Sequence, residues 1–364
     1  MAAVQIYFIT NRNYDPDNEN SPFGAYLDPG SPDPKGYNPD GVAALRFGHA
    51  TFEVAGDKAT MQECYVYPDP RVLKSRNTVP AVGSGNFLDD LRKDMLGGRD
   101  ALVFIHGFNV SFLDALTAGA LLASTLPDTL KLIVFSWPSD GLAIPYMSYY
   151  SDREDARASG PALARAYLKL FDFVKDLREA EVAAAEEAGA DSPPPSRVLC
   201  DRCIHVLAHS MGNYLLRNGI QAIRVKEPLK MVRMFDQVIM AAPDEDDDTF
   251  ECDDKLRVLP TMARRITVYH NRRDRALVIS DKTKANPDRL GSEGPRMLDL
   301  LPKKVIIVDC ARIAGPADPL IFHSYYIHSR SIAKDISAVL ADKEDDKIGN
   351  REEIRVGRAY RIKA

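Results

Sequence analysis

The sequence lacks the features of disulfide-stabilised, secreted and membrane-spanning proteins. Its 364 residues include only five cysteines, an odd number spread thinly along the chain, so no disulfide framework is expected. The N-terminus has neither the positive segment nor the cleavage site of a signal peptide. The most apolar long stretch, 115–127, is interrupted by Thr, Gly and Ser and is too short to cross a bilayer. These absences predict a globular, cytoplasmic protein.

An excess of positive charge is also missing. The chain has 47 Lys and Arg residues against 52 Asp and Glu residues, which gives a net charge of -5. Proteins that bind a phosphate backbone usually carry a basic surface, so nucleic acid is not an expected partner. An acidic run at 244–248 and a lone pair, Cys200 and Cys203, complete no metal site, and we expect neither a metal nor a cofactor.

Short apolar runs alternate with segments of helical spacing. Strands are expected at 4–9, 51–55, 101–106, 131–137, 204–209, 236–242, 265–270 and 304–309, and helices at 112–124, 152–186, 211–224 and 325–342. Several strands are apolar at consecutive positions, which is typical of parallel strands covered on both faces. The alternation predicts an α/β fold with a doubly wound, mostly parallel eight-stranded sheet flanked by helices, in one domain over 1–364.

Three segments depart from this alternation. Residues 14–41 contain six prolines and four glycines and predict a long surface loop. Residues 179–197 run from a helix end into a proline-rich connection, which indicates an insertion. Residues 350–364 alternate apolar with mostly basic side chains, so we expect an amphipathic arm that packs on the chain's own body or on a second subunit of a homo-oligomer.

The strongest chemical feature is Ser210, which follows an apolar strand and precedes a helical pattern. A sharp strand-to-helix turn needs small residues two positions before and two after its apex, and Ala208 and Gly212 supply them. A serine at such an apex projects above the carboxyl edge of the sheet, where the N–H of Met211 can stabilise an oxyanion. Because this spacing often arises by chance, the surrounding sequence must support the interpretation.

A second feature lies at the end of the strand expected at 101–106, which leads directly into Gly107. A glycine here lets the backbone turn and aim the N–H of Phe108, or that of Asn109, at a developing negative charge. Gly107 equally suits a simple turn. Because this turn and the turn at Ser210 both follow predicted strands, the two together favour the functional interpretation.

A serine hydroxyl needs a base to remove its proton, and the base needs a third group to orient it. Asp274 follows an apolar strand and His323 precedes the last helix, so Ser210, Asp274 and His323 occur in the chain order that this sheet topology uses. Two alternatives stay open. Asp244, at the end of the preceding strand, competes for the role of the acid, and His328 competes for the role of the base.

The wider pattern resembles the α/β-hydrolase superfamily, and within it a poorly characterised bacterial branch of esterase-like serine hydrolases. The matching motifs occur in the expected order: YFITNR, FIHGFN, FSWPSDG, HVLAHSMGN, AAPD, YHNRRDRAL and HSYY. The resemblance implies Ser210 as nucleophile, His323 as base and Asp274 as acid. It also implies an oxyanion hole formed by the N–H groups of Phe108 and Met211. The alanine that precedes HS departs from the commonest glycine but is also small.

The sequence therefore predicts a serine esterase that acts on a small-molecule carboxylic ester through an acyl-enzyme. Asn109, Trp137 and Tyr149 are candidates to line the substrate pocket, although Trp137 equally suits a packing role. Thioesterases, amidases and acyltransferases share the triad, so the sequence does not separate them from esterases. A non-catalytic scaffold that binds a ligand or a protein partner is the alternative from a different class.

Overall fold

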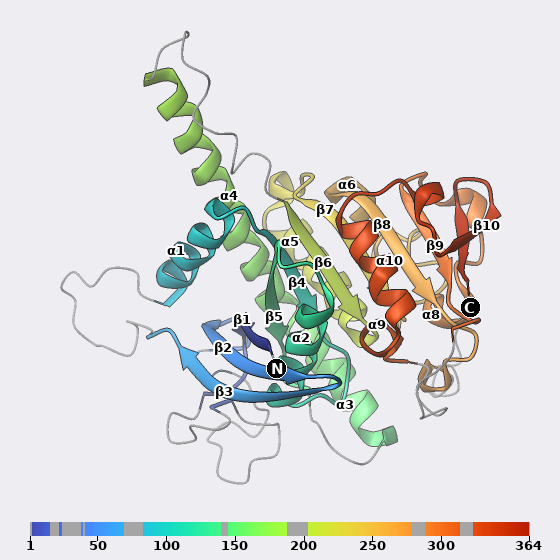
Figure 1. Cartoon of the computed structure of the whole chain (residues 1–364), viewed down its shortest axis with the longest axis horizontal. Helices are drawn as coiled ribbons and strands as arrows, with labels where there is room; N and C mark the ends of the chain where they lie inside the picture. Colours follow the sequence, from blue (N-terminus) through green and yellow to red (C-terminus); the bar gives the residue numbers. More distant parts are fainter. Residues whose placement is uncertain are drawn as a thin grey trace.

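The computed structural model describes residues 2–14, 22–23, 38, 41–68, 83–139, 145–187, 203–277, 288–313 and 323–363. At their centre lies one 11-stranded sheet (Figure 1). Its strands are β1 (Ala2–Thr10), β2 (Arg46–Ala55), β3 (Lys58–Val66), β4 (Asp100–Ile105), β5 (Leu130–Ser136), β6 (Ile204–His209), β7 (Phe235–Ala241), β8 (Ala263–His270), β9 (Val305–Asp309), β10 (Arg351–Arg355) and β11 (Ala359–Ile362). They lie in the order β10-β11-β9-β8-β7-β6-β4-β5-β1-β2-β3. Every pairing from β11 to β1 is parallel, and the strands beyond them pair antiparallel.

All eight predicted strands are present and the sheet is mostly parallel, but it has three strands more than predicted. β3 has no fully buried side chain and β10 buries only its first, so neither carries the continuous apolar run of a covered strand. β10 and β11 form a hairpin within the predicted C-terminal arm, and β11 pairs with β9. The arm therefore extends the chain's own sheet.

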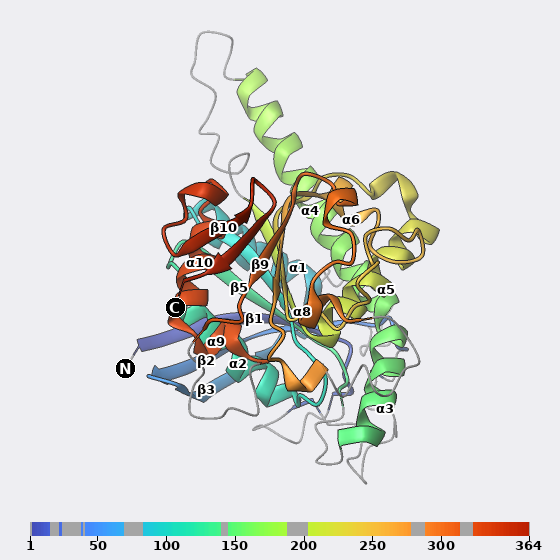
Figure 2. The ribbon, with the colours of Figure 1, turned by 90° about the vertical axis from the view of Figure 1, so that its right-hand side faces the viewer.

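Helices cover both faces of the sheet. The helices are α1 (Gly83–Leu96), α2 (Phe112–Thr125), α3 (Pro145–Ala158), α4 (Gly160–Glu187), α5 (Met211–Lys226), α6 (Leu259–Met262), α8 (Leu290–Glu293), α9 (Tyr325–His328) and α10 (Arg330–Leu340), with short 3-10 turns η2 (Pro228–Lys230), η3 (Leu298–Leu300) and η4 (Asp345–Lys347). One apolar core joins α1, α3, α4 and α5 to one face of the sheet, and a second joins α2, α9 and α10 to the other. Figure 2 shows α3, α4 and α5 on the opposite side of the sheet from α2, α9 and α10.

Two of the predicted helices are each divided in two. The helix expected at 152–186 becomes the end of α3 and most of α4, which begins at Gly160. A Cβ on Gly160 would lie 2.9 Å from Asn218 of α5, so the glycine lets the start of α4 approach α5 closely. The helix expected at 325–342 becomes α9 and α10, because Ser329 caps α10 by accepting a hydrogen bond from the N–H of Ile332.

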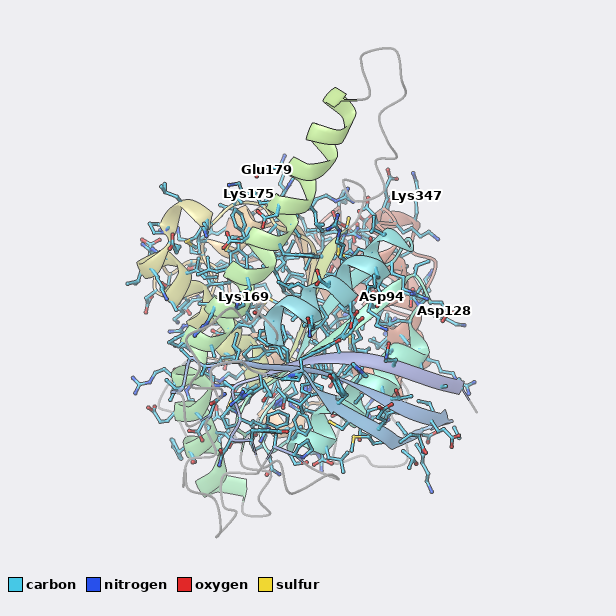
Figure 3. All side chains as sticks on the ribbon, turned by 90° about the vertical axis from the view of Figure 1, so that its left-hand side faces the viewer. Asp94, Asp128, Lys169, Lys175, Glu179 and Lys347 are labelled. Atoms are coloured by element: carbon cyan, nitrogen blue, oxygen red, sulfur yellow. The ribbon has the colours of Figure 1, made fainter. Side chains whose placement is uncertain are left out.

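Parts of two predicted segments lie outside the described residues. Of the predicted loop 14–41 the structure describes only residues 14, 22, 23, 38 and 41, and of the predicted insertion 179–197 only the helical part up to residue 187. That part belongs to α4, which continues beyond the other helices, with Lys175 and Glu179 near the point where it leaves them (Figure 3). Within the described residues, no helix is both long and apolar enough to cross a membrane.

The parallel strands bring the candidate catalytic residues to one edge of the sheet. Because β4, β6 and β8 run in the same direction, the loops that follow them meet at their carboxyl ends. These loops carry Phe108, Ser210 and Asp274, and the chain after β9 returns to the same edge with His323.

Candidate active site

Ser210 lies at the apex of the tight turn between β6 and α5. Its φ of 52° and ψ of -124° place it in a region that residues other than glycine rarely adopt. Hydrogen bonds hold this conformation. The Ser210 N–H donates to the carbonyl of Ala241 at 3.0 Å, and the Ser210 carbonyl accepts from the N–H groups of Asn213 at 3.0 Å and Asp244 at 3.1 Å. This is the strained turn that exposes a nucleophilic serine in α/β folds.

Two glycines allow the neighbouring loops to approach this turn. A Cβ on Gly212 would lie 2.6 Å from the carbonyl oxygens of both Ile105 and His106, at the end of β4. A Cβ on Gly107 would lie 3.1 Å from the Cβ of Ser210. Only residues without a Cβ fit these positions unchanged, so the two glycines set the short distance between the β4 loop and Ser210.

Asp274 and His323 form a hydrogen-bonded pair. The Nδ1 of His323 donates to the Oδ2 of Asp274 at 2.7 Å, and the carboxylate is fully buried. The other carboxylate oxygen accepts from the N–H groups of Ala276 and Leu277, which fixes the orientation of Asp274. With its proton on Nδ1, the neutral imidazole presents a lone pair on Nε2. Within the described residues this Nε2 has no hydrogen-bond partner, and His323 lines the same cavity as Ser210.

The environment of His323 favours its charged form. Burial by itself lowers the pKa of an imidazole, but the negative charge of Asp274, the hydrogen bond to it and the more distant charge of Asp244 together raise the pKa of His323 above its ordinary value. A base that becomes more basic in its site is suited to hold a proton during a reaction.

The two competing residues take other positions. Asp244 is buried, accepts a hydrogen bond from the hydroxyl of Tyr149 at 2.8 Å and lies 3.4 Å from the guanidinium of Arg289. His328 is exposed on α9 at the edge of the cavity, and within the described part of the chain its ring makes no hydrogen bond to a carboxylate. The structure therefore joins Asp274, rather than Asp244, to His323.

His209, which precedes Ser210, contacts His323. Its Nε2 donates to the carbonyl of His323 at 3.1 Å, and its ring packs 4.6 Å from the ring of His323 and 4.4 Å from that of Tyr326. Burial, and then the neighbouring charge of a protonated His323, lower the pKa of His209 well below its ordinary value. His209 therefore stays neutral and holds the segment that carries His323.

The N–H groups of Phe108 and Met211 are those predicted to form an oxyanion hole. Within the described residues, neither N–H donates a hydrogen bond to the protein. Met211 is the first residue of α5, where the positive end of the helix favours a negative charge. Phe108 lines the cavity beside Ser210.

His106 orients the peptide group that carries the Phe108 N–H. The N–H of Trp137 donates to Nε2 of His106 at 3.1 Å, so the proton of His106 is on Nδ1, which donates to the Gly107 carbonyl at 2.8 Å. Burial and the nearby charge of Arg12 lower the pKa of His106 to about 3, so the ring stays neutral. Because C=O and N–H point in opposite directions across a trans peptide, the Phe108 N–H points away from His106.

The fully buried side chain of Arg12 ties this loop, residues 107–110, to the end of β5. Its guanidinium donates to the hydroxyl of Ser136 at 3.0 Å, to the carbonyl of Ser139 at 3.2 Å and to the carbonyl of Val110 at 2.7 Å. No role for Arg12 was predicted from the sequence. The available indication was a cation placed two residues after an apolar strand, within the motif YFITNR.

Asp152 of α3 holds the same loop from the other side. It is fully buried and accepts hydrogen bonds from the Asn109 N–H at 2.6 Å and from the Ser139 hydroxyl at 2.5 Å. The Ser139 hydroxyl oxygen in turn accepts from the Val110 N–H at 3.1 Å. Of the two backbone N–H groups considered as oxyanion donors in this loop, that of Asn109 is thus already bonded and that of Phe108 is available.

A cavity of about 310 Å³ lies over Ser210 and His323. The described residues that line this cavity do not include Asn109, Trp137 or Tyr149, and their role in a substrate pocket stays a prediction. Trp137 is fully buried because its indole stacks on His106, with ring centroids 5.2 Å apart, as its alternative packing role required. Tyr149 is buried with its hydroxyl on Asp244, and Asn109 bonds to α3.

The acidic run at 244–248 faces cationic side chains of the protein. Arg289 contacts Asp246 at 2.5 Å, and Lys255 bonds to both Asp246 and Asp248. Within the described residues, no three His, Cys, Asp or Glu side chains are grouped so that they could hold a metal ion.

Comparison with known proteins gives one family. The chain matches the model of a family described as "Alpha/beta hydrolase of unknown function (DUF900)" over residues 84–182 and 198–342. The chain belongs to this family. The match spans Phe108, Ser210, Asp274 and His323, and it establishes the α/β-hydrolase fold that the motifs predicted.

The chain also matches individual proteins. An uncharacterized protein, alr1448, from Nostoc sp. strain PCC 7120 is 23% identical over 251 residues, which cover 62% of this chain and 57% of the Nostoc protein. The matched part thus spans little more than half of that relative. Among solved structures, dienelactone hydrolase from Anabaena variabilis has a TM-score of 0.30 at 10% identity, with 68% of this chain and 85% of that one covered. Carboxylesterase CesB from Bacillus subtilis has a TM-score of 0.28 at 8% identity, with 81% and 92% covered.

Proposed function

We propose that this α/β-hydrolase is a serine esterase that cleaves carboxylic esters through an acyl-enzyme on Ser210. One observation carries the proposal. The 2.7 Å hydrogen bond from His323 to Asp274 leaves Nε2 of His323 without a protein partner, in the cavity that also contains Ser210. A hydroxyl, a base and an acid that orients the base are the groups that acyl transfer requires.

The reaction proceeds in two steps on these residues. As the Ser210 oxygen attacks the ester carbonyl, its proton moves to Nε2 of His323, and the N–H groups of Phe108 and Met211 hold the negative carbonyl oxygen. Asp274 stabilises the imidazolium. The bond to the leaving alcohol then breaks as His323 returns the proton to its oxygen. In the second step, water loses a proton to His323, attacks the acyl-enzyme and releases the acid and the free serine.

Hydrolysis of nitrophenyl acetate, compared with the matching thioester and anilide, tests the reaction class. We expect ester hydrolysis with a burst of nitrophenol, because acyl-enzyme formation precedes its hydrolysis. A higher kcat/KM for the thioester or the anilide would assign the site to a thioesterase or an amidase. If the folded chain acts on none of the three, the non-catalytic scaffold becomes the better description.

The pH dependence provides a further prediction. Only neutral His323 can accept the serine proton, so kcat/KM should rise with pH through the pKa of His323. Because Asp274 and Asp244 raise this pKa, the midpoint of the acid limb is expected above the ordinary imidazole value of about 6.5. Asp244→Asn removes one of these charges and should move the midpoint to lower pH. Initial rates between pH 4 and pH 9 give the midpoints of the parent and of Asp244→Asn, and a parent midpoint below about 6.5 contradicts the role of His323.

A further inference from the structure

The cavity over Ser210 continues into a groove between α2 and α9, which lie side by side in Figure 1. Four residues of α2 line it: Asp114, Thr117, Ala118 and Leu121. Their spacing of three, four and seven positions from Asp114 places them in one stripe on the helix. The opposite wall comes from α9 and the residue before it, with Ser324, Tyr326, Ile327 and His328.

The groove has the length of a short aliphatic chain. Asp114 and Leu121 are seven residues apart, and a rise of 1.5 Å per residue gives a groove of about 10 Å. An extended chain advances roughly 1.2 Å per bond, since three backbone bonds span about 3.5 Å, so the groove accommodates roughly eight bonds.

The lining of the groove favours an uncharged occupant. Ala118, Leu121 and Ile327 are half-buried and present apolar side chains to it. The carboxylate of Asp114 and the imidazole of His328, which also lie on its walls, are exposed to solvent. Transfer of an apolar chain from water into such a groove lowers the free energy of the complex, whereas Asp114 would repel a negatively charged substrate.

We infer that this groove binds the leaving alcohol of the ester, and that the preferred substrates are esters of uncharged, unbranched aliphatic alcohols. The inference rests on the proposed function. His323 must return its proton to the leaving oxygen, so the group attached to that oxygen lies on the His323 side of Ser210. The groove is the part of the cavity on that side, because His323 lines it and its second wall is the helix that His323 precedes.

Two ester series separate the alcohol from the acyl group. The first contains acetates of linear alcohols from methanol to octanol, and the second contains methyl esters of linear acids of the same lengths. The initial rate of acid release gives kcat/KM for each ester in both series. Ala118→Leu narrows the groove from a half-buried position of α2, and leucine is a strong helix former. It should lower kcat/KM for the longer alcohols at least about tenfold and leave methyl acetate and the acid series unchanged.

Ser124→Leu adds an apolar side chain to an exposed position of α2 outside the groove and serves as the matched control, with both series expected unchanged. Leu121→Ala lengthens the groove and should shift the optimum to longer alcohols. Loss of activity along the acid series in Ala118→Leu, or no change in either series, overturns the inference while the esterase stands. A parent chain that hydrolyses no ester overturns the proposed function itself.

Discussion

Asp274→Asn is expected to lower kcat about 10⁴-fold with little change in KM. The carboxylate of Asp274 holds the proton of His323 on Nδ1, which keeps the Nε2 lone pair available for the serine proton. An asparagine can turn its amide N–H₂ toward Nδ1 and so favour the tautomer protonated on Nε2, which cannot act as the base. The asparagine oxygen can still accept from the N–H groups of Ala276 and Leu277, so the loop is expected to fold.

Asp244→Asn is the matched control for this variant. Asp244 is equally buried and also follows a strand of the sheet, but its partners are Tyr149 and Arg289. Steady-state kinetics on nitrophenyl acetate should show a loss smaller than about tenfold, as for a residue that does not orient the base. If Asp244→Asn abolished activity and Asp274→Asn retained it, Asp244 would be the acid. Circular dichroism and thermal unfolding establish that both variants are folded.

Arg12→Lys is expected to lower kcat about 100- to 1000-fold, the loss that follows removal of one oxyanion donor. The Ser139 and Val110 carbonyls accept from two different nitrogens of the planar Arg12 guanidinium, and the single nitrogen of a lysine cannot reproduce that geometry. Lysine keeps the positive charge in the core, so the variant tests the geometry of the loop rather than the loss of a buried cation. The Phe108 N–H should then be poorly aimed, which lowers kcat more than it raises KM.

Arg351→Lys controls for the general effect of replacing a buried arginine. Arg351 is buried in β10 and pairs with Asp335, far along the sheet from Ser210. This variant should lower the melting temperature and leave kcat of the folded protein unchanged. If kcat of Arg12→Lys, scaled to its folded fraction, is as unchanged as that of Arg351→Lys, Arg12 acts through stability alone.

The sequence predicted those features that depend on local pattern. Buried parallel strands appear as apolar runs, and the turn at Ser210 shows its small neighbours Ala208 and Gly212, which the close approach of the β4 loop requires. β3 was missed because an edge strand has an exposed face and no such run. The helix break before Gly160 was missed because its cause is a contact with α5, more than 50 residues away in the chain.

The parts of the site that depend on distant contacts could not be predicted. Arg12 reaches Val110 across 98 positions and Asp152 reaches Asn109 across 43, and neither spacing has a sequence pattern. Trp137 is buried against His106, and this stacking contact could not be predicted from a tryptophan at the end of a strand. The choice between Asp244 and Asp274 likewise required the hydrogen bond to His323.

Labelling with a fluorophosphonate probe tests most directly whether Ser210 is an activated nucleophile. Intact-mass analysis and peptide mapping locate the adduct. We predict one adduct on Ser210, none in Ser210→Ala, and much slower labelling in His323→Ala, because the probe reacts only with a serine whose proton is removed. A parent chain that is folded but takes no label, or a Ser210→Ala chain that still takes it, would contradict the proposed mechanism.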